Sequence, residues 1–151
     1  MAKSQHSIRV DQITVAQTIA IRHRVLRQGK PIETCHFKGD DLPTTIHLGL
    51  FVNDTLIGIA TYLDHSRFEK NNEVQLRGMA ILPEWQGKSL GSYLIKKGEE
   101  IAINRKKEML WCNVRVSAQK FYQKMNFQTQ GDTFTIPDVG PHIIMEKQLV
   151  R

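Results

Sequence analysis

The stretch Met79–Gly91, MAILPEWQGKSLG, decides the fold of this chain. The apolar run 76–82 is typical of a strand, and Pro83 ends it because proline has no backbone N–H for a strand ladder. A polar turn over 86–89 follows, and residues 90–107 then show the apolar spacing of a helix. This order exposes the N–H groups of the first helical turn. Because the helix dipole is positive there, the sequence predicts an anion site, with phosphate the commonest anion.

Length and composition indicate one globular domain over residues 1–151. Hydrophobic residues make up 40% and charged residues 24%, and no apolar run is long enough for a membrane helix. The start, MAKSQHSIRV, lacks the apolar region of a secretory signal. Cys35 and Cys112 lie far apart without a partner motif, which favours two buried free thiols. We therefore expect a cytoplasmic protein without a metal site.

The formal net charge is +6, which is compatible with binding nucleic acid, an anionic membrane or a phosphorylated cofactor. Charge alone does not choose among these partners. The longest basic run, residues 105–107, suits the C-terminus of the predicted helix without any ligand. Nucleic-acid binding is therefore a hypothesis that rests on charge only, because the chain shows no basic reading helix.

Apolar periodicity predicts the remaining elements. A short strand over 7–10 precedes a helix that we expect Asp11 to cap, with Val15, Ala16, Ile19, Ala20 and Leu26 on its apolar stripe and Arg22 on another face. After an irregular loop over 29–44, the pattern predicts a hairpin of strands 46–52 and 56–63, a strand over 73–82, the helix over 90–107, a strand over 109–114, a helix over 118–125 capped by Ser117, and closing strands over 127–136 and 142–149.

This element order predicts an α+β fold with one mixed sheet of six to seven strands flanked by helices. Most neighbouring strands should run antiparallel. The crossover helix between the strands at 74–82 and 109–114 should make that pair parallel.

Two short motifs support a family resemblance. Residues Gln86–Gly91, QGKSLG, resemble the acyl-CoA-binding motif of the GNAT (Gcn5-related) N-acetyltransferases, with Ser89 where that family usually has Gly. Residues 111–127, WCNVRVSAQKFYQKMNF, resemble the family's second signature, with Asn126 in place of the usual Gly before Phe127. The end, GPHIIMEKQL, resembles a small bacterial branch of the family. The similarity covers about residues 8–149.

The resemblance implies an acyl-CoA-dependent N-acyltransferase that uses acetyl-CoA. The backbone N–H groups near the helix start would hold the pyrophosphate, Lys88 would add positive charge, and the strand before the turn would pair with the pantetheine arm. The arm would lie where two parallel strands separate, near 79–81 and 112–114. The predicted cofactor-binding residues are Met79, Ala80, Ile81, Gln86, Gly87, Lys88, Ser89, Leu90, Gly91, Ser92, Asn113 and Tyr122.

The resemblance places Tyr122 near the thioester sulfur, where a phenol can protonate the departing thiolate. The alternative is that Tyr122 is a packing residue. The general base is less defined, because the strand position that carries a carboxylate in several relatives falls on Gln75. Glu73, two residues earlier on the same face, and His142 are the candidate bases, and a water relay without a single base is the alternative.

The resemblance thus predicts acetyl transfer to a primary amine, small or on a peptide, by direct attack in a ternary complex. The acceptor would dock between the loop 29–44 and the segment 137–142. The rival hypothesis is a non-catalytic module that binds or senses CoA, which Gln75 and Ser89 motivate. Dimers are common in this family, so a homodimer is a further expectation. Binding to a membrane or to nucleic acid is not expected.

Overall fold

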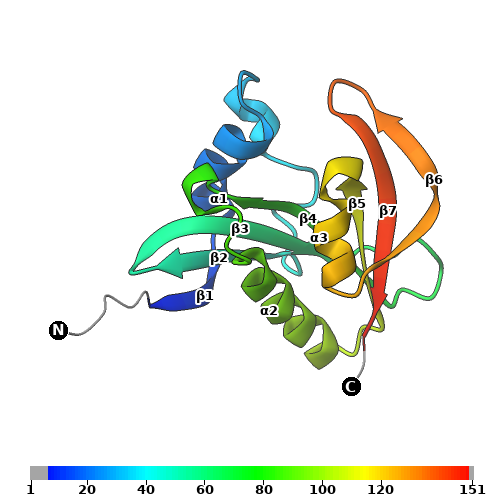
Figure 1. Ribbon diagram of the computed structural model, residues 1–151. Coiled ribbons are helices and arrows are strands. Elements are labelled where there is room, and N and C mark those ends of the chain that lie inside the picture. The colour runs from blue at the N-terminus through cyan, green and yellow to red at the C-terminus, as the bar shows by residue number, and fades with distance from the viewer. Residues whose placement is uncertain (1–6, 150–151) are drawn as a thin grey trace. The chain divides into compact units, whose positions relative to one another are not determined.

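The computed structural model describes residues 7–149. Its seven strands form one mixed sheet in the order β1-β2-β3-β4-β5-β7-β6, which confirms the predicted fold class (Figure 1). The backbone divides into two compact units. Unit 1 contains the described residues up to 63 together with Gly78–Gly98, and unit 2 contains Asp64–Arg77 and the described residues from 99 onward. The expectation of a single domain stays a prediction.

Unit 1 carries the N-terminal half of the fold. Its strands β1, β2 and β3 pair antiparallel in chain order. Its elements are β1 (Ile8–Ile13), α1 (Val15–Ile21), a π-helical segment (Arg22–Leu26), a 3₁₀ turn (Ile32–Cys35), β2 (Ile46–Val52), β3 (Thr55–Leu63), the second half of β4 (Glu73–Ile81), a 3₁₀ turn (Pro83–Trp85) and the first part of α2 (Gly91–Asn104).

The hairpin of β2 and β3 confirms the predicted pair of strands. Asn53 and Asp54 form its turn with φ angles of 49° and 69°, the left-handed conformation that a two-residue hairpin turn requires. Thr55 already belongs to β3, so the strand begins one residue earlier than predicted.

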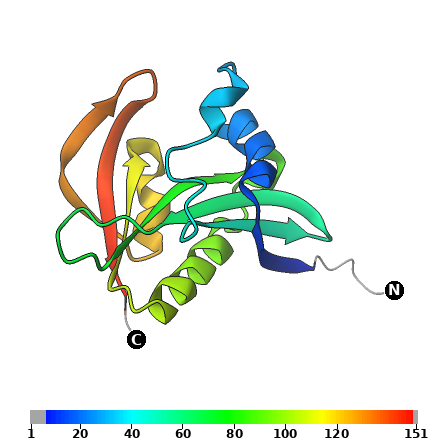
Figure 2. The same cartoon turned by 180° about the vertical axis from the view of Figure 1, so that it is seen from behind.

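Strand β3 is buried on both faces because a helix covers each. Thr61 faces α1 and its π-helical extension, where it accepts a hydrogen bond from Arg22. The next side chain, Tyr62, points the other way and donates to the backbone oxygen of Leu94 in α2. A Cβ at Gly98 would lie 1.9 Å from the Tyr62 ring, so glycine at this position allows the close approach of helix and sheet. Figures 1 and 2 show the two helices on opposite sides of β3.

The first helix differs from its prediction in start and in orientation. Asp11 lies within β1, and Thr14 is the N-cap, where its hydroxyl accepts from the Gln17 N–H while the Gln17 side chain accepts from the Thr14 N–H. This capping box competes successfully with an Asp11 cap because it satisfies two backbone donors. The helix accordingly buries Thr18, Ile21 and Arg22, whereas Ala16 and Ala20 of the predicted stripe are exposed.

Unit 2 contains the parallel pair that the crossover helix predicts. Residues Glu73–Gln75 of β4 pair parallel with Met109–Trp111, and β5 and β6 each pair antiparallel with β7. Its further elements are β5 (Met109–Arg115), a 3₁₀ turn (Val116–Ala118), α3 (Gln119–Lys124), β6 (Gln128–Ile136) and β7 (Gly140–Gln148). The predicted Ser117 cap is wrong, because Ser117 lies within the 3₁₀ turn and α3 starts without a side-chain cap.

Alternation along the strands gives the sheet of unit 2 two different faces. The register puts Gln75 opposite Trp111 and Trp111 opposite Glu146, so these side chains share one face with Glu73. Cys112, one residue along β5, points to the other face. Figure 1 shows α3 in front of β5, and Figure 2, from behind, shows the loop between β3 and β4 on the opposite side.

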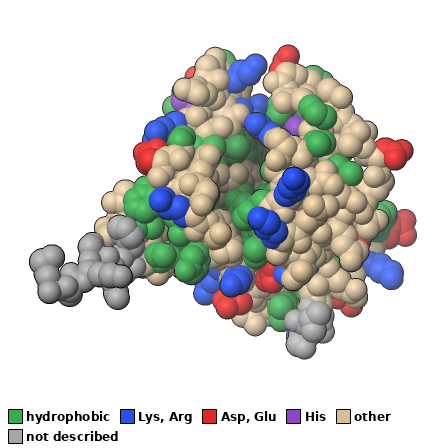
Figure 3. All heavy atoms as spheres, in the orientation of Figure 1, with side chains coloured by type: hydrophobic (Ala, Val, Ile, Leu, Met, Phe, Trp, Pro, Cys, Tyr) green, Lys and Arg blue, Asp and Glu red, His purple; other side chains and the backbone are tan. Residues whose placement is uncertain are grey.

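No helix among the described residues is long and apolar enough to cross a membrane. Figure 3 shows Lys and Arg side chains scattered over one face, with Asp and Glu among them, rather than gathered in one patch.

Candidate active site

The turn between β4 and α2 is held from both ends. The Gln86 side chain donates from Nε2 to the Ile81 backbone oxygen over 2.8 Å, which ties the turn back to the strand. The Ser92 hydroxyl donates to the Ser89 oxygen over 2.8 Å, which closes the first turn of the helix. Leu90 is 8% exposed and anchors the turn in the core. These contacts tie the backbone of 87–91 to the end of β4 and to the first turn of α2.

The top of this turn is open to a ligand. Gly87 adopts φ +77°, and a Cβ built there would have no atom within 4 Å. Gly87, Lys88 and Ser89 are exposed, and α2 begins at Gly91 with fourteen residues, so its N-terminal N–H groups and its dipole end face this open space. An exposed, rigid turn at a helix start with a lysine beside it fits a pyrophosphate.

Ser89 occupies a left-handed position with φ +60°. Such a conformation costs a non-glycine residue about 1–2 kcal/mol. This explains why glycine is the usual residue at this point of the motif, and it shows that serine preserves the turn at some cost. Asn126, the second departure from the family motifs, also adopts a left-handed φ of 70°, which asparagine tolerates at the end of a helix.

Strand β4 is kinked immediately before the predicted pantetheine-binding residues Met79, Ala80 and Ile81. Gly78 has φ +62°, and a Cβ there would lie 3.2 Å from the Phe37 ring and 3.4 Å from Arg22 Nε. A buried cluster therefore supports the kink from the side of α1. The cluster fixes where the backbone of 79–81 can present its N–H and C=O groups.

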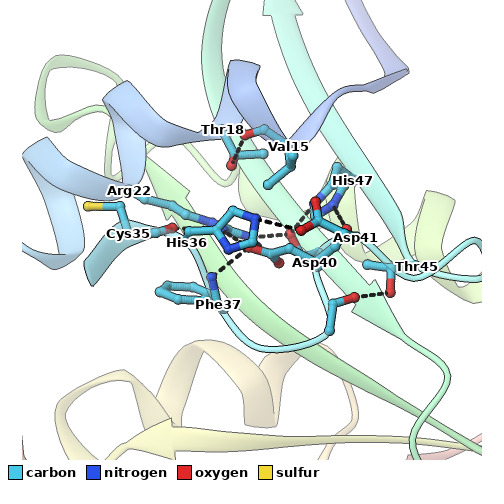
Figure 4. Close-up of polar contacts among 12 residues, drawn as sticks. Val15, Thr18, Arg22, Cys35, His36, Phe37, Asp40, Asp41, Thr45 and His47 are labelled. Carbon is cyan, nitrogen blue, oxygen red and sulfur yellow. Dashed lines mark hydrogen bonds and ion pairs between the residues drawn. The ribbon is translucent and has the colours of Figure 1, made fainter. Parts of the chain in front are cut away.

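Figure 4 shows this cluster, which joins the π-helical segment, the loop before β2 and the sheet. Arg22 is 0% exposed and donates to both carboxylate oxygens of Asp40, over 2.7 and 3.1 Å. It also donates to the Cys35 backbone oxygen and to the Thr61 hydroxyl, each over 2.8 Å. Its guanidinium stacks 4.0 Å from the centre of the Phe37 ring.

His47 completes the cluster in one tautomer. Its Nε2 lies 3.0 Å from the Asp40 backbone oxygen, which only accepts, so Nε2 carries the proton. Its Nδ1 then accepts from the Thr61 hydroxyl over 2.9 Å. Burial alone would raise the pKa of Asp40, but hydrogen bonds from Arg22 and from the Phe37 N–H outweigh it, so this pKa is lowered.

The sequence pattern did not reveal the cluster, because an arginine in a helix normally reads as exposed. The available signal was the spacing of Thr18, Ile21 and Arg22, which lie on one helix face. A buried arginine requires a carboxylate partner. The loop over 29–44 contains the adjacent carboxylates Asp40 and Asp41, which were candidates for this partner.

In unit 2, Tyr122 lies on α3 with its ring 5.5 Å from that of Phe127 and 5.1 Å from that of Phe121. Burial raises the pKa of its phenol, and the nearby Cys112 raises it further. The phenol is therefore neutral, with its proton, throughout the working pH range. Burial also raises the pKa of Cys112 to about 12, so its thiol stays protonated and is a poor nucleophile.

Both carboxylate oxygens of the predicted base Glu73 accept hydrogen bonds from Arg67. Arg67 donates to Glu73 from Nε and Nη2, over 2.9 and 2.8 Å, and also to Glu146 over 2.8 Å. Burial would raise the pKa of Glu73, but the bonds from the side chain and backbone of Arg67 outweigh it, and the pKa is lowered. A carboxylate with a lowered pKa and three hydrogen bonds is a weak base, so the geometry disfavours this role.

The other predicted residues of unit 2 lie on β5 and β7. Asn113 is exposed on the Trp111 face, where it can meet a ligand. His142 is buried, donates from Nδ1 to the Gly140 oxygen over 2.8 Å, and stands opposite Arg115 in the β5–β7 register. The predicted opening between 79–81 and 112–114, and the predicted acceptor site between 29–44 and 137–142, each span the two units and stay predictions.

Both cysteines are free and buried, as predicted. Within residues 7–149, no group of three or more His, Cys, Asp or Glu side chains is placed to hold a metal ion.

Comparison with known proteins agrees with this geometry. Residues 16–127 match the model of the acetyltransferase (GNAT) family. An uncharacterized N-acetyltransferase of Bacillus subtilis, YitI, is 37% identical over 144 residues, which cover 94% of this chain and 97% of that protein.

Two solved structures show the same fold at low identity. An aminoglycoside 6'-N-acetyltransferase complexed with coenzyme A superposes with a TM-score of 0.76 at 11% identity, over 94% of this chain and 97% of that one. An N-acetyltransferase from Staphylococcus aureus superposes with a TM-score of 0.75 at 14% identity, over 95% and 99%. With the phosphate-fitting turn, the kinked strand and the family match over most of its length, the chain belongs to the acetyltransferase (GNAT) family.

Proposed function

We propose that this protein transfers an acetyl group from acetyl-CoA to a primary amine by direct attack in a ternary complex. The open turn over Gln86–Gly91 at the start of α2 is the observation that carries the proposal, because its geometry fits a pyrophosphate. The coenzyme A complex of a protein with this fold supports the same ligand class.

Unit 1 would hold the cofactor. The N–H groups of 87–92 would bind the pyrophosphate, Lys88 would add charge, and the backbone of Met79–Ile81 would pair with the pantetheine arm. Gln86 would position the turn through its bond to Ile81. Bound acetyl-CoA supplies an activated thioester, and the residues of the chain bind, orient and move protons.

Unit 2 would provide the general acid and a polar contact. Tyr122 would give its proton to the leaving thiolate. The raised pKa keeps the phenol protonated, so that a proton is present when the thiolate forms. Asn113 would hydrogen-bond to the bound arm. Direct attack is favoured over a covalent enzyme intermediate because both cysteines are buried and the pKa of Cys112 is raised to about 12.

Binding and turnover test the proposal separately. Acetyl-CoA at a hundredfold excess over Kd should stabilise the fold by about 2.7 kcal/mol and raise the Tm. A panel of polyamines, amino acids, aminoglycosides and peptide N-termini, assayed by release of free CoA, should contain an acceptor. Binding without turnover on any amine would favour the sensing module instead, and no Tm shift at millimolar cofactor would contradict both.

Tyr122→Phe should lower kcat about 10- to 100-fold and leave KM nearly unchanged, because it removes only the transferable proton. Tyr93→Phe is the matched control, since Tyr93 is 45% exposed on α2 and has no proposed role. An unchanged kcat would show that Tyr122 is a packing residue and not the general acid.

A further inference from the structure

The proposed reaction needs a base, because an ammonium ion must lose a proton before its nitrogen can attack. The carboxylates on the Trp111 face of unit 2 do not offer one. Glu73 and Glu146 both accept from Arg67, and the Asp64 carboxylate is paired with Lys107 at 2.8 Å. Sequence reasoning missed a residue on the loop between β3 and β4 that lies beside them.

That residue is His65, which three contacts hold in place. The Trp111 indole N–H donates to the His65 backbone oxygen over 2.8 Å. The two rings meet edge to face with centroids 5.5 Å apart. The imidazole Nδ1 lies 3.1 Å from Oε1 of Gln75. The imidazole is thus exposed to solvent yet fixed against the sheet by two side chains that are 7% exposed or less.

The bond to Gln75 selects the tautomer. An amide oxygen only accepts, so Nδ1 must donate, and the lone pair of the neutral ring is on Nε2. This is the arrangement of a general base, in which one ring nitrogen is oriented by an acceptor and the other can take a proton. Gln75 cannot itself act as a base, but it can orient one.

The surroundings of His65 suit a base better than those of His142. When a base takes a proton it becomes imidazolium, which nearby carboxylates stabilise. Asp64 and Glu73 lie beside His65, and His65 itself contributes to the lowered pKa of Glu73. Arg67 and Lys107 offset part of this negative charge. His142 is 5% exposed, so its ring is less accessible to an acceptor amine than the exposed ring of His65.

We propose that His65 is the general base of the acetyl transfer, with Gln75 and Trp111 as its positioning residues; this rests on the proposed function. In the step, Nε2 takes a proton from the acceptor ammonium, and the neutral amine nitrogen then forms the new bond to the acyl carbon. The carbon–sulfur bond breaks, and the thiolate receives the Tyr122 proton. The acylated nitrogen releases its surplus proton to water, which gives the neutral amide, and Tyr122 regains its proton from water. Cys112 and Trp111 are neighbours on β5, and their side chains point to opposite faces of the sheet. Cys112 lies near the acid Tyr122, whose pKa it raises, and Trp111 donates a hydrogen bond to the base His65. The acid and the base therefore stand on opposite sides of the sheet.

The first test needs no substrate. Nitrogen NMR shifts of the His65 ring in the free protein should show the tautomer protonated on Nδ1. Gln75→Met, which removes the acceptor at similar volume, should give a mixture of tautomers. A ring protonated on Nε2 in the wild-type protein would overturn the proposal.

The second test is kinetic. His65→Gln should lower kcat/KM for the amine at least 100-fold, leave KM for acetyl-CoA unchanged, and abolish the fall in rate on the acid side of the pH profile. Gln75→Met should lower kcat about 10-fold with that acid limb retained, as expected of a positioning residue. His23→Gln is the matched control, because the His23 ring bonds to the Lys30 backbone oxygen within unit 1 and has no proposed role.

The outcomes separate the two proposals. Wild-type activity and an intact acid limb in His65→Gln would overturn the role of His65 and leave the proposed function in place. A wild-type protein without turnover on any amine would overturn both. Unfolding midpoints of each variant confirm that the chain still folds.

Discussion

Two arginine–carboxylate clusters, one in each unit, use the same chemistry in different surroundings. Arg22 and Asp40 are both 0% exposed in their side chains, deep between the first helix and the sheet. Arg67 and Glu73 retain 13% and 5% exposure, and the second partner, Glu146, retains 22%. Each arginine also packs on an aromatic ring, Phe37 in one cluster and Trp111 in the other.

The difference teaches what burial does to an ion pair. In the closed cluster of Arg22, removal of one partner leaves an uncompensated buried charge, so the pair locks the loop before β2 and the kink at Gly78. The cluster of Arg67 is partly exposed, so water can replace a lost partner more easily there. In this cluster Arg67 mainly keeps Glu73 and Glu146 in ion pairs, as their hydrogen-bond donor. We therefore expect the first cluster to act mainly on stability, and the second mainly to hold Glu73 and Glu146 as ion-pair partners.

The largest expected effect comes from Asp40→Ala. It leaves the Arg22 guanidinium buried without its carboxylate, and we expect a loss of about 3–5 kcal/mol of unfolding free energy in urea titrations. The double variant Arg22→Met with Asp40→Leu should regain most of this loss, because it removes both charges. A loss below about 1 kcal/mol in Asp40→Ala would contradict the locking role.

Arg67→Met should have an intermediate effect of about 1–3 kcal/mol on the same measurement. Glu73 and Glu146 lose their shared donor, but Glu146 is 22% exposed and Glu73 keeps its hydrogen bond from the backbone N–H of the Arg67 position. Arg67→Lys should recover less than half, because a single ammonium cannot bridge both carboxylates with the same geometry. Destabilisation as large as that of Asp40→Ala would contradict the claim that the more deeply buried cluster contributes more to stability.

A smaller difference should appear in acid. Asp40 and Glu73 both have lowered pKa values in the folded protein, so each contributes stability above its unfolded pKa, near 4, that is lost as the pH falls through the folded pKa. Asp40→Asn and Glu73→Gln should each flatten the decline in Tm between about pH 4 and pH 2. An unchanged slope in both variants would contradict the pKa assignment.

The smallest effect should come from the exposed contact of Arg9 with Asp54, whose side chains are 44% and 90% exposed. Asp54→Asn keeps the left-handed turn and removes only the charge, so the Tm should not change measurably. A shift in Tm comparable to that of Arg67→Met would show that the exposure of an ion pair does not determine how much it contributes to stability.

The sequence alone determined the elements whose signals are local. Pro83, the QGKSLG turn and the apolar period after it fixed the strand–turn–helix unit, and Asn53-Asp54 fixed the hairpin, because proline, glycine and turn residues restrict their own backbone. The same local signals located the predicted phosphate site and the parallel pair of strands that flanks the crossover helix.

Only the tertiary structure decided the roles of the charged and polar side chains. Arg22 and Asp40 are 18 residues apart, His65 and Trp111 are 46 apart, and Arg67 and Glu146 are 79 apart. No periodicity in a sequence links such positions. A side chain acquires its protonation state and its role from the partners that folding brings within hydrogen-bond distance, and that is why Glu73 looked like a base in the sequence and is an ion-pair partner in the fold.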